Sequence, residues 1–342
     1  MKSEQAIVDF YIYPPVGRDD WRYVFQTAQV RALELQMLNR ATLLDMANAE
    51  NFKQAVDLLA SSEYAIGQSG KNFTEVENIL RSQRTKVRVL FADLMIDKPV
   101  VELFRARDDF ANLRLAVRRT LTKRPLGTDY SSDGNVSAEH FEEVFEQENY
   151  SLLPGYMAEA IERAILAYYQ NKDIRQIDYA IDNVQAEYNL SKAAQFKNVF
   201  LQGLFRIQID LTNIRTMLRL KYTDSGERNV FLRGGYIGLE RLKHGLDIDY
   251  EAMGALFFVT PQHRLVETGA GYLASEKSFL GLEQQCEEFL TGFLKTTTQI
   301  TAGPQPVIAY LLMKENEIRK VRLILTAKKS SLDTKLILDR VS

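Results

Sequence analysis

Acidic side chains at helical spacing are the first residues in this sequence that could do chemistry. Asp108 and Asp109, followed by Asn112, superficially resemble the acidic motif that holds Mg²⁺ on a helix in prenyl-transforming enzymes. Such a site needs several carboxylates facing one pocket, because Mg²⁺ gives up its hydration water reluctantly. A related segment further along the chain has Ile209 in place of Asp108, and no matching acidic cluster follows. A Mg²⁺-dependent enzyme acting on diphosphates is therefore the least favoured of three hypotheses.

Other patterns that could indicate catalysis or cofactor binding are incomplete. Residues 67–72 (GQSGKN) share only Gly-Lys with a phosphate-binding loop, and no strand is expected before them. His140 and His244 have no ligand partner at metal-binding spacing. The single cysteine, Cys286, stands beside two glutamates, which disfavour a reactive thiolate. We therefore expect no catalytic residue, no cofactor and no metal site.

The composition is that of an ordinary folded protein. The chain has 342 residues, of which 46% are apolar and 26% charged, with a formal net charge of -2. This length predicts two or three sub-domains, and the charge balance does not indicate nucleic acid as a partner. No apolar run approaches the roughly 20 residues that cross a bilayer, and the N-terminus lacks a signal-peptide core. We expect a cytoplasmic protein whose association with any membrane is peripheral.

The chain repeats one helical segment. Long stretches rich in helix-forming residues, with prolines at their boundaries, predict the all-α class. Leu103–Thr122 recurs without a gap as Leu204–Thr223, 101 residues later, with eight of twenty positions identical. The identical positions include the pairs Asp109 and Asp210, Asn112 and Asn213, and Arg114 and Arg215. The same offset relates Gly134 to Gly235, so the loop after the helix is repeated as well.

A third, weaker copy lies in Leu311–Leu325, 107 residues beyond the second. It aligns Glu317 with Asp210 and Arg322 with Arg215, although Lys320 replaces the asparagine. We therefore divide the chain into an N-terminal extension and three helical repeats of about 100 residues each, namely 1–19, 20–130, 131–228 and 229–342. Three tandem copies predict either a solenoid or a closed pseudo-threefold arrangement, and the low copy number slightly favours closure.

The repeated helix has an apolar stripe at the helical period, which predicts a side facing the core. Its members are Leu103, Ala106, Phe110, Leu113, Val117 and Leu121 in the first copy, and Leu204, Ile207, Leu211, Ile214, Leu218 and Tyr222 in the second. Polar residues border the stripe. We expect them to pair with neighbouring helices. We also expect Arg105 to pair with Asp109, and Arg206 with Asp210, at i,i+4. The alternative is that they line a cavity or docking surface. Gly234-Gly235 predicts a tight turn or a loop that contacts a partner.

Several motifs in order resemble those of a known family. They are Tyr23…Ala28-x-Val30-Arg31-Ala32…Met37-Leu38, the two D-x-x-N-[LI]-R helices that begin at Asp109 and Asp210, Leu232-x-Gly234-Gly235-x-Ile237, and Tyr310…Lys314-Glu315-x-Glu317…Arg322. Together they resemble the C subunit of the V-type and A-type rotary ATPases (ATP synthases), the AC39 or vacuolar d-subunit family, from about residue 20 to residue 330. Departures are Lys320 and the extension before Trp21.

The resemblance implies a funnel of three similar helical domains around a pseudo-threefold axis. It implies a non-catalytic central-stalk subunit on the cytoplasmic face of a membrane, between shaft subunits of the D/F type and the proteolipid ring that transports protons or sodium ions. The candidate structural or partner-contact residues are Asp109, Asn112, Arg114, Asp210, Asn213, Arg215, Gly234, Gly235, Glu317 and Arg322. The alternative hypothesis is a free-standing helical-repeat scaffold for protein interactions.

Overall fold

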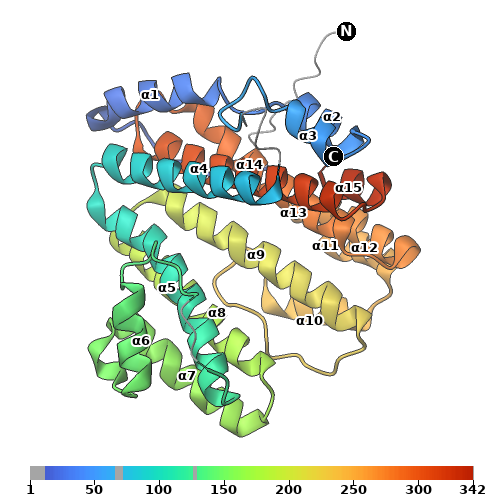
Figure 1. Ribbon diagram of the computed structural model, residues 1–342. Coiled ribbons are helices and arrows are strands. Elements are labelled where there is room, and N and C mark those ends of the chain that lie inside the picture. Colours follow the sequence, from blue (N-terminus) through green and yellow to red (C-terminus); the bar gives the residue numbers. More distant parts are fainter. Residues whose placement is uncertain (1–11, 66–71, 126–128, 342) are drawn as a thin grey trace. The chain divides into compact units, whose positions relative to one another are not determined.

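The computed structural model describes residues 12–65, 72–125 and 129–341. Within these ranges every regular element is a helix, which confirms the predicted all-α class (Figure 1). The chain forms two compact units. The terminal unit contains both chain ends, Met1–Ile96 and Asp247–Ser342, and the middle unit is Asp97–Leu246.

The terminal unit is built from nine α-helices and three short 3₁₀ turns in the described residues. The helices are α1 (Val24–Glu34), α2 (Arg40–Asn48), α3 (Phe52–Asp57), α4 (Phe73–Leu94), α11 (Met253–Phe257), α12 (His263–Glu276), α13 (Leu280–Lys295), α14 (Pro304–Lys329) and α15 (Thr334–Val341). The 3₁₀ turns are η1 (Trp21–Tyr23), η3 (Tyr250–Ala252) and η4 (Thr296–Gln299).

The middle unit holds two long helices of equal length and the shorter helices between and after them. Its elements are α5 (Lys98–Leu121), α6 (Ala138–Glu146), η2 (Tyr150–Leu152), α7 (Gly155–Asn171), α8 (Arg175–Gln195), α9 (Val199–Tyr222) and α10 (Leu239–Asp247). Helices α5 and α9 each have 24 residues, and α6 and α10 each have 9. Both pairs are related by the 101-residue offset of the sequence repeat, so the repeat extends to the bounds of these helices.

Local sequence explains where many of the helices begin. The side chain of an asparagine or serine caps each of five helices by accepting a hydrogen bond from a first-turn N–H, which leaves fewer unsatisfied amides. These caps are Asn39 on α2, Asn51 on α3, Asn72 on α4, Ser137 on α6 and Asn198 on α9. Helices α5 and α14 instead have proline in the first turn, where the missing N–H is harmless.

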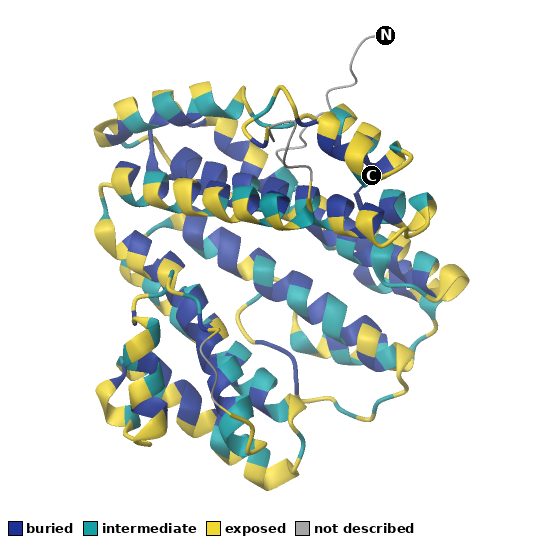
Figure 2. Cartoon of the chain, in the orientation of Figure 1, coloured by how far each residue is buried: buried dark blue, intermediate teal, exposed yellow. Residues whose placement is uncertain are grey.

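Helix α14 is the centre of the terminal unit. It packs against α1, α2, α3, α4, α13 and α15. A helix enclosed on most sides must be apolar around most of its circumference, and α14 is buried at most positions from Pro304 to Leu312 and again at Ile318, Val321, Ile324 and Leu325. Its long neighbour α4 is amphipathic instead, with one side buried and the other exposed (Figure 2).

The described part of the N-terminal extension packs onto the start of α14 and the end of α13. The Asp19 carboxylate accepts a 2.8 Å hydrogen bond from the Thr301 N–H. The Gln305 side-chain amide donates to the Val16 carbonyl at 3.1 Å. The ring of Tyr13 lies 5.1 Å from that of Phe289. Residues 12–19 therefore belong to the packed body of the terminal unit.

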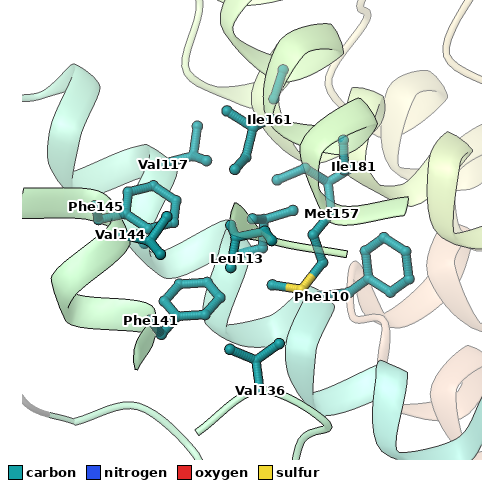
Figure 3. Packing of buried hydrophobic residues seen from close by; sticks show 14 of the residues in the cluster. Phe110, Leu113, Val117, Val136, Phe141, Val144, Phe145, Met157, Ile161 and Ile181 are labelled. Atoms are coloured by element: carbon teal, nitrogen blue, oxygen red, sulfur yellow. The ribbon is translucent and has the colours of Figure 1, made fainter. Parts of the chain in front are cut away.

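The core of the middle unit forms where α5 meets α6, α7 and α8. Phe110, Leu113 and Val117 on α5 contact a cluster that includes Phe141 from α6 and Ile161 from α7 (Figure 3). All five are buried. These three α5 residues belong to the apolar stripe that the sequence predicts, and both copies of the stripe face the interior except at their last residues. Tyr222 is 44% exposed and Leu121 only partly buried, because each stands at the final turn of its helix.

The three long helices α5, α9 and α14 end alike. The residue two positions past each helix has a left-handed backbone, with φ of 54° at Lys123, 49° at Asp224 and 53° at Ser331. The next N–H then bonds back to a carbonyl in the last turn, as Arg124 does to Arg119 at 2.9 Å and Ser225 to Leu220 at 2.9 Å. This Schellman pattern usually has glycine at the left-handed position, so all three sites hold a side chain where glycine is favoured.

Candidate functional site

The repeated aspartate and asparagine of α5 form one side of a clamp on the loop that follows the helix. The Asn112 amide exchanges two hydrogen bonds with the Ser131 backbone, donating to its carbonyl at 2.9 Å and accepting from its N–H at 2.8 Å. One turn earlier, Asp109 Oδ1 accepts from the N–H groups of Asn135 and Val136, at 2.9 and 3.1 Å. Both side chains are buried, so these bonds replace the water that the loop backbone loses.

The second oxygen of Asp109 is used as well. Its Oδ2 accepts from the Asn135 side-chain amide at 2.9 Å and from the Tyr156 hydroxyl at 2.7 Å. Burial, together with the bond to the Asp109 carboxylate, raises the pKa of the Tyr156 hydroxyl above its ordinary value. The clamp thus joins α5, the loop and α7. It also places Val136 in the core cluster of the middle unit (Figure 3).

The clamp recurs in α9 at the same spacing. Asn213 exchanges two bonds of 2.8 Å with the backbone of Leu232, nineteen residues on, as Asn112 does with Ser131. Asp210 accepts from the N–H groups of Tyr236 at 3.1 Å and Ile237 at 3.0 Å. Neither Asp210 nor Asn213 is exposed by more than 1%. The repeated residues therefore have a repeated geometry.

Burial dominates the electrostatics of the second clamp. It raises the pKa of Asp210 from 3.8 to about 6, although the two backbone hydrogen bonds and the nearby charge of Arg206 favour the ionised form. The Arg206 guanidinium lies 5.4 Å from the centre of the Tyr236 ring, a cation–π distance. Tyr236 itself is 47% exposed. The loop therefore has a buried, anchored side and a side that faces outward.

Glycine is required in each loop because the carboxylate approaches the backbone closely. A Cβ at Gly134 would overlap Asp109 Oδ1, and a Cβ at Gly235 would overlap Asp210 Oδ1. Gly234 has a φ of +93°, a backbone conformation that residues other than glycine rarely adopt. The glycine pair therefore makes the tight turn that the sequence predicts before α10.

In the third copy of the repeat, which lies on α14 in the terminal unit, a glutamate stands where the first two copies have an aspartate. Glu317 accepts a 2.6 Å hydrogen bond from the Leu38 N–H, in the loop that leads to α2. It also accepts from the Tyr64 hydroxyl at 2.6 Å and from Lys314 Nζ at 2.7 Å. Lys314 bonds in addition to Glu63, at 3.0 Å. Burial and the Glu317 charge raise the pKa of the Tyr64 hydroxyl. Here a charged cluster replaces the aspartate–asparagine pair.

Two of the three candidate arginines tie their helices to other helices of the same unit. Arg114 forms an ion pair with Asp182, and its Nε lies 3.5 Å from Asp178, both on α8. Arg322 on α14 donates two bonds of 3.1 Å to the Glu77 carboxylate on α4. Arg215, the candidate on α9, is half-buried. The ion pairs of Arg114 and Arg322 hold α5 against α8 and α14 against α4.

The expected ion pair between Arg105 and Asp109 is wrong. Arg105 and Asp109 stand at i,i+4, but Asp109 is fully buried and both of its oxygens bond to the loop and α7, whereas Arg105 is exposed. The sequence signal for the true partner was present. Asp109 and Gly134 both recur 101 residues later, and a carboxylate and a glycine that recur together indicate a close approach between them.

The residues that the sequence analysis considered for catalysis, phosphate binding or metal binding lie in different parts of the chain. Residues 67–71 of the segment compared with a phosphate-binding loop fall outside the described residues, and Asn72 caps α4. Asp108 is buried beside Ser131, Cys286 is buried in α13, and His140 is partly exposed in the first turn of α6. In the described part of the chain, no three His, Cys, Asp or Glu side chains gather as metal ligands would. None of the helices there is long and apolar enough to span a bilayer.

A comparison with known protein families identifies the family of this chain. Residues 26–340 match the family described as ATP synthase (C/AC39) subunit, and this range includes most of α1, the long helices α5, α9 and α14, and the loops that contain Gly134 and Gly235. The chain belongs to the C/AC39 subunit family. The match extends over both compact units, so the family assignment holds for the chain as a whole.

This C/AC39 family member is similar to bacterial and archaeal proteins along nearly its whole length. It is 22% identical to the C subunit of the V-type sodium ATPase of Enterococcus hirae, over 91% of this chain and 95% of the relative. It is 22% identical to the C subunit of the A-type ATP synthase of Thermococcus onnurineus, over 95% and 92%. It is 23% identical to the C subunit of the V-type ATP synthase of Thermus thermophilus, over 91% and 94%.

Proposed function

We propose that this chain is a non-catalytic central-stalk subunit of a V/A-type rotary ATPase. It couples the rotor shaft of the soluble head to the membrane proteolipid ring, and so serves proton or sodium transport, or ATP synthesis. The observation that carries the proposal is the family match over residues 26–340. It is supported by relatives named as C subunits of V-type and A-type enzymes, which align over more than nine-tenths of their own length.

The clamps suit a part that transmits torque. A coupling element has to resist deformation, and close-packed helices with low compressibility provide stiffness. Loops are normally the softest segments of a helical protein. Here the loops before α2, α6 and α10 are each fastened by a buried acid on a long helix, Glu317, Asp109 and Asp210 respectively. Three copies of one fastening serve a mechanical role better than a single reaction.

Under this proposal the three repeats, 20–130, 131–228 and 229–342, form a funnel around a pseudo-threefold axis. Shaft subunits of the D/F type enter its central cavity, and the proteolipid ring binds at the other end. The protein lies peripherally on the cytoplasmic face of the membrane. The ten candidate residues act mainly by holding the contact loops in place, and the exposed Tyr236, beside the glycine pair, meets a partner directly.

Isolation from native membranes tests the proposal. The chain would be tagged at its C-terminus, extracted in mild detergent, and its partners identified by mass spectrometry. We expect the catalytic head subunits, the D/F-type shaft and the proteolipid to be recovered in constant ratio, and the complex to lose ion transport driven by ATP when the chain is deleted. Recovery of the chain alone, or with partners from no rotary ATPase, would contradict the proposal.

The same preparation separates the alternatives. A free-standing scaffold would bring down other proteins, and its gene would lie apart from genes for the head and ring. A diphosphate enzyme would bind Mg²⁺ and pyrophosphate, and Asp108→Ala with Asp109→Ala would abolish that binding. We expect the purified chain to show neither Mg²⁺-dependent diphosphate binding nor ATP hydrolysis of its own.

A further inference from the structure

The carboxylate of Asp210 is enclosed by the loop that it holds. Asp210 is fully buried, and it accepts hydrogen bonds from the backbone N–H groups of Tyr236 and Ile237. The loop backbone also lies directly against the acid, since a Cβ at Gly235 would overlap Asp210 Oδ1. Hydration of this carboxylate therefore requires the loop to move away from α9. We call residues 232–237 the Gly-Gly loop.

The two clamps stabilise an ionised acid by different means. In the first clamp, the side chains of Asn135 and Tyr156 donate to Asp109 Oδ2 in addition to the two loop N–H groups. Hydrogen bonds donated to a carboxylate favour its charged form. The 101-residue offset sets Tyr236 opposite Asn135, and the Tyr236 ring lies 5.4 Å from the Arg206 guanidinium. In the second clamp, an aromatic ring beside a cation thus takes the place of an amide donor.

Water weakens the charge that favours ionised Asp210. Arg206, one turn earlier on α9, supplies this charge, and its side chain is exposed. Solvent and salt screen the interactions of exposed charges. On the Gly-Gly loop itself, burial raises the pKa of the Tyr236 hydroxyl, and Arg233 is exposed. Arg206 therefore offsets only part of the cost of burying a charge at Asp210.

The other elements that contact α9 near the acid do so through apolar side chains. A small buried cluster joins α8, α9 and the loop, and it consists of Ala186, Leu190, Ile209 and Leu232. Glu187, which stands among these residues on α8, pairs with Arg163 on α7 at 2.9 Å. Helix α10 meets α9 at Met217 and α5 meets it at Phe205, so both contacts lie more than one turn from Asp210.

The balance of these effects makes closure of the loop depend on pH. Burial raises the pKa of Asp210 to about 6 while the loop is closed, against 3.8 for the ordinary carboxyl. Below about pH 4 the acid is protonated whether the loop is closed or open. Between about pH 4 and pH 6 it ionises mainly when the loop opens, so a rising pH favours opening. The difference between the two pKa values corresponds to a change on the order of a hundredfold in the opening equilibrium.

We propose that the Gly-Gly loop is a pH-responsive element, which Asp210 holds closed in acid and which opens increasingly as the pH rises toward neutral. Opening releases Tyr236 from its fixed position beside Arg206. The inference deepens the proposed function, on which its physiological role rests, because it adds regulation to the loop that presents Tyr236 to a partner. The response of the loop is a property of the chain alone.

Amide hydrogen exchange of the full-length chain tests the proposal. Protection factors, which correct for the intrinsic effect of pH on exchange, are measured for the Tyr236 and Ile237 N–H groups at pH 4.5 and pH 6.5. We expect both to fall by about tenfold or more as the pH rises. The N–H groups of Asn135 and Val136, which Asp109 holds in the same sample, are the internal reference and should fall much less.

Two variants identify the responsible group. Asp210→Asn keeps an oxygen that can accept from the loop N–H groups but cannot ionise, so the protection of Tyr236 should no longer change between the two pH values. Arg206→Gln removes the charge that favours ionisation, so the fall in protection should extend to higher pH. Arg105→Gln, at the equivalent exposed position of α5, is the matched control and should leave the Tyr236 profile as in wild type.

The opposite results are equally clear. Protection of Tyr236 and Ile237 that stays constant or rises between pH 4.5 and pH 6.5 would overturn the proposal. An equal fall at both clamps would overturn it as well, because it would report opening of the whole middle unit. A fall that persists in Asp210→Asn assigns the response to another group, and if that variant does not fold, an unchanged profile in Arg206→Gln has the same meaning. These failures leave the proposed function standing, because isolation from native membranes tests it separately.

Discussion

The Glu317 carboxylate accepts a 2.6 Å hydrogen bond from the N–H of Leu38, which lies 279 residues earlier in the chain. In the middle unit, Asp210 accepts the same kind of bond from Ile237, only 27 residues later. The bond in the terminal unit therefore fastens a loop near the start of the chain with an acid near its end. The same local device thus operates over very different distances in sequence.

Removing this acid should loosen the N-terminal loops first. Glu317→Ala leaves the Leu38 N–H and the Tyr64 hydroxyl without their partner, and it leaves Lys314 buried with Glu63 alone. Breaking a buried charged pair costs about 3–5 kcal/mol. We expect a loss of that order in the free energy of unfolding, with faster hydrogen exchange in residues 36–65. Arg319→Ala, on the exposed side of α14, is the control and should change little.

The loops that contain Gly134 and Gly235 have no room for even the methyl group of alanine at these positions. Gly235→Ala places a Cβ against the Asp210 carboxylate, and overpacking of this kind costs about 1–3 kcal/mol. Gly238→Ala is the matched control three residues away, where a Cβ would meet nothing within 4 Å. Urea unfolding of the two variants measures the difference.

Coupling between the loop and the acid gives a sharper test of the same contact. In an Asp210→Ala background the carboxylate is gone, so adding Gly235→Ala should cost less than it does in wild type. Strictly additive losses would show that the glycine is needed for another reason.

The second clamp should make stability depend on pH. Burial raises the pKa of Asp210 to about 6 in the folded protein, against 3.8 for the ordinary carboxyl. Below about pH 4 the group is protonated in both states. As the pH rises toward 6 the unfolded chain ionises first, so the folded state loses about 3 kcal/mol relative to a residue that cannot ionise. Above that pH the difference is constant.

Asp210→Asn supplies the non-ionising reference. The free energy of unfolding of the variant, minus that of wild type, should rise between pH 4 and pH 6 and then level off. Asp129→Asn should give the opposite slope, and only below about pH 4, because the hydrogen bond from Arg119 lowers the pKa of that exposed carboxyl below 3.8. A difference for Asp210→Asn that stays flat or falls as the pH rises would contradict the assigned shift.

The left-handed ends of the long helices offer a stabilising change. Ser331 has a φ of 53°, where a side chain is unfavourable by about 1 kcal/mol. Ser331→Gly should therefore raise the free energy of unfolding by about that amount. Ser330→Gly, one residue earlier with a φ of -84°, should lower it instead. Equal effects of the two variants in a thermal melt would argue against the backbone explanation.

The sequence was informative where the determinants are local or repeated. The apolar stripes place Phe110 and Leu211 in the interior, and the 101-residue offset of the sequence repeat also relates the bounds of α5 to those of α9. Local spacing wrongly predicted an ion pair between Arg105 and Asp109, because the buried Asp109 carboxylate instead accepts a hydrogen bond from Asn135, 26 residues later in the chain. The contact between Glu317 and Leu38 could not be predicted, since no short-range pattern links positions so far apart. The exposure of Phe25 likewise could not be predicted, because it depends on which side of α1 packs against α14.

The position of both chain ends in one compact unit sets the order in which the protein can fold during synthesis. Helix α4 packs against α14, which begins at Pro304, so its apolar side waits until most of the chain has left the ribosome. At about 5–20 residues per second this delay is on the order of tens of seconds. The middle unit, contiguous from Asp97 to Leu246, is complete well before then. During synthesis, the apolar side of α4 therefore remains without α14 after the whole middle unit has been made.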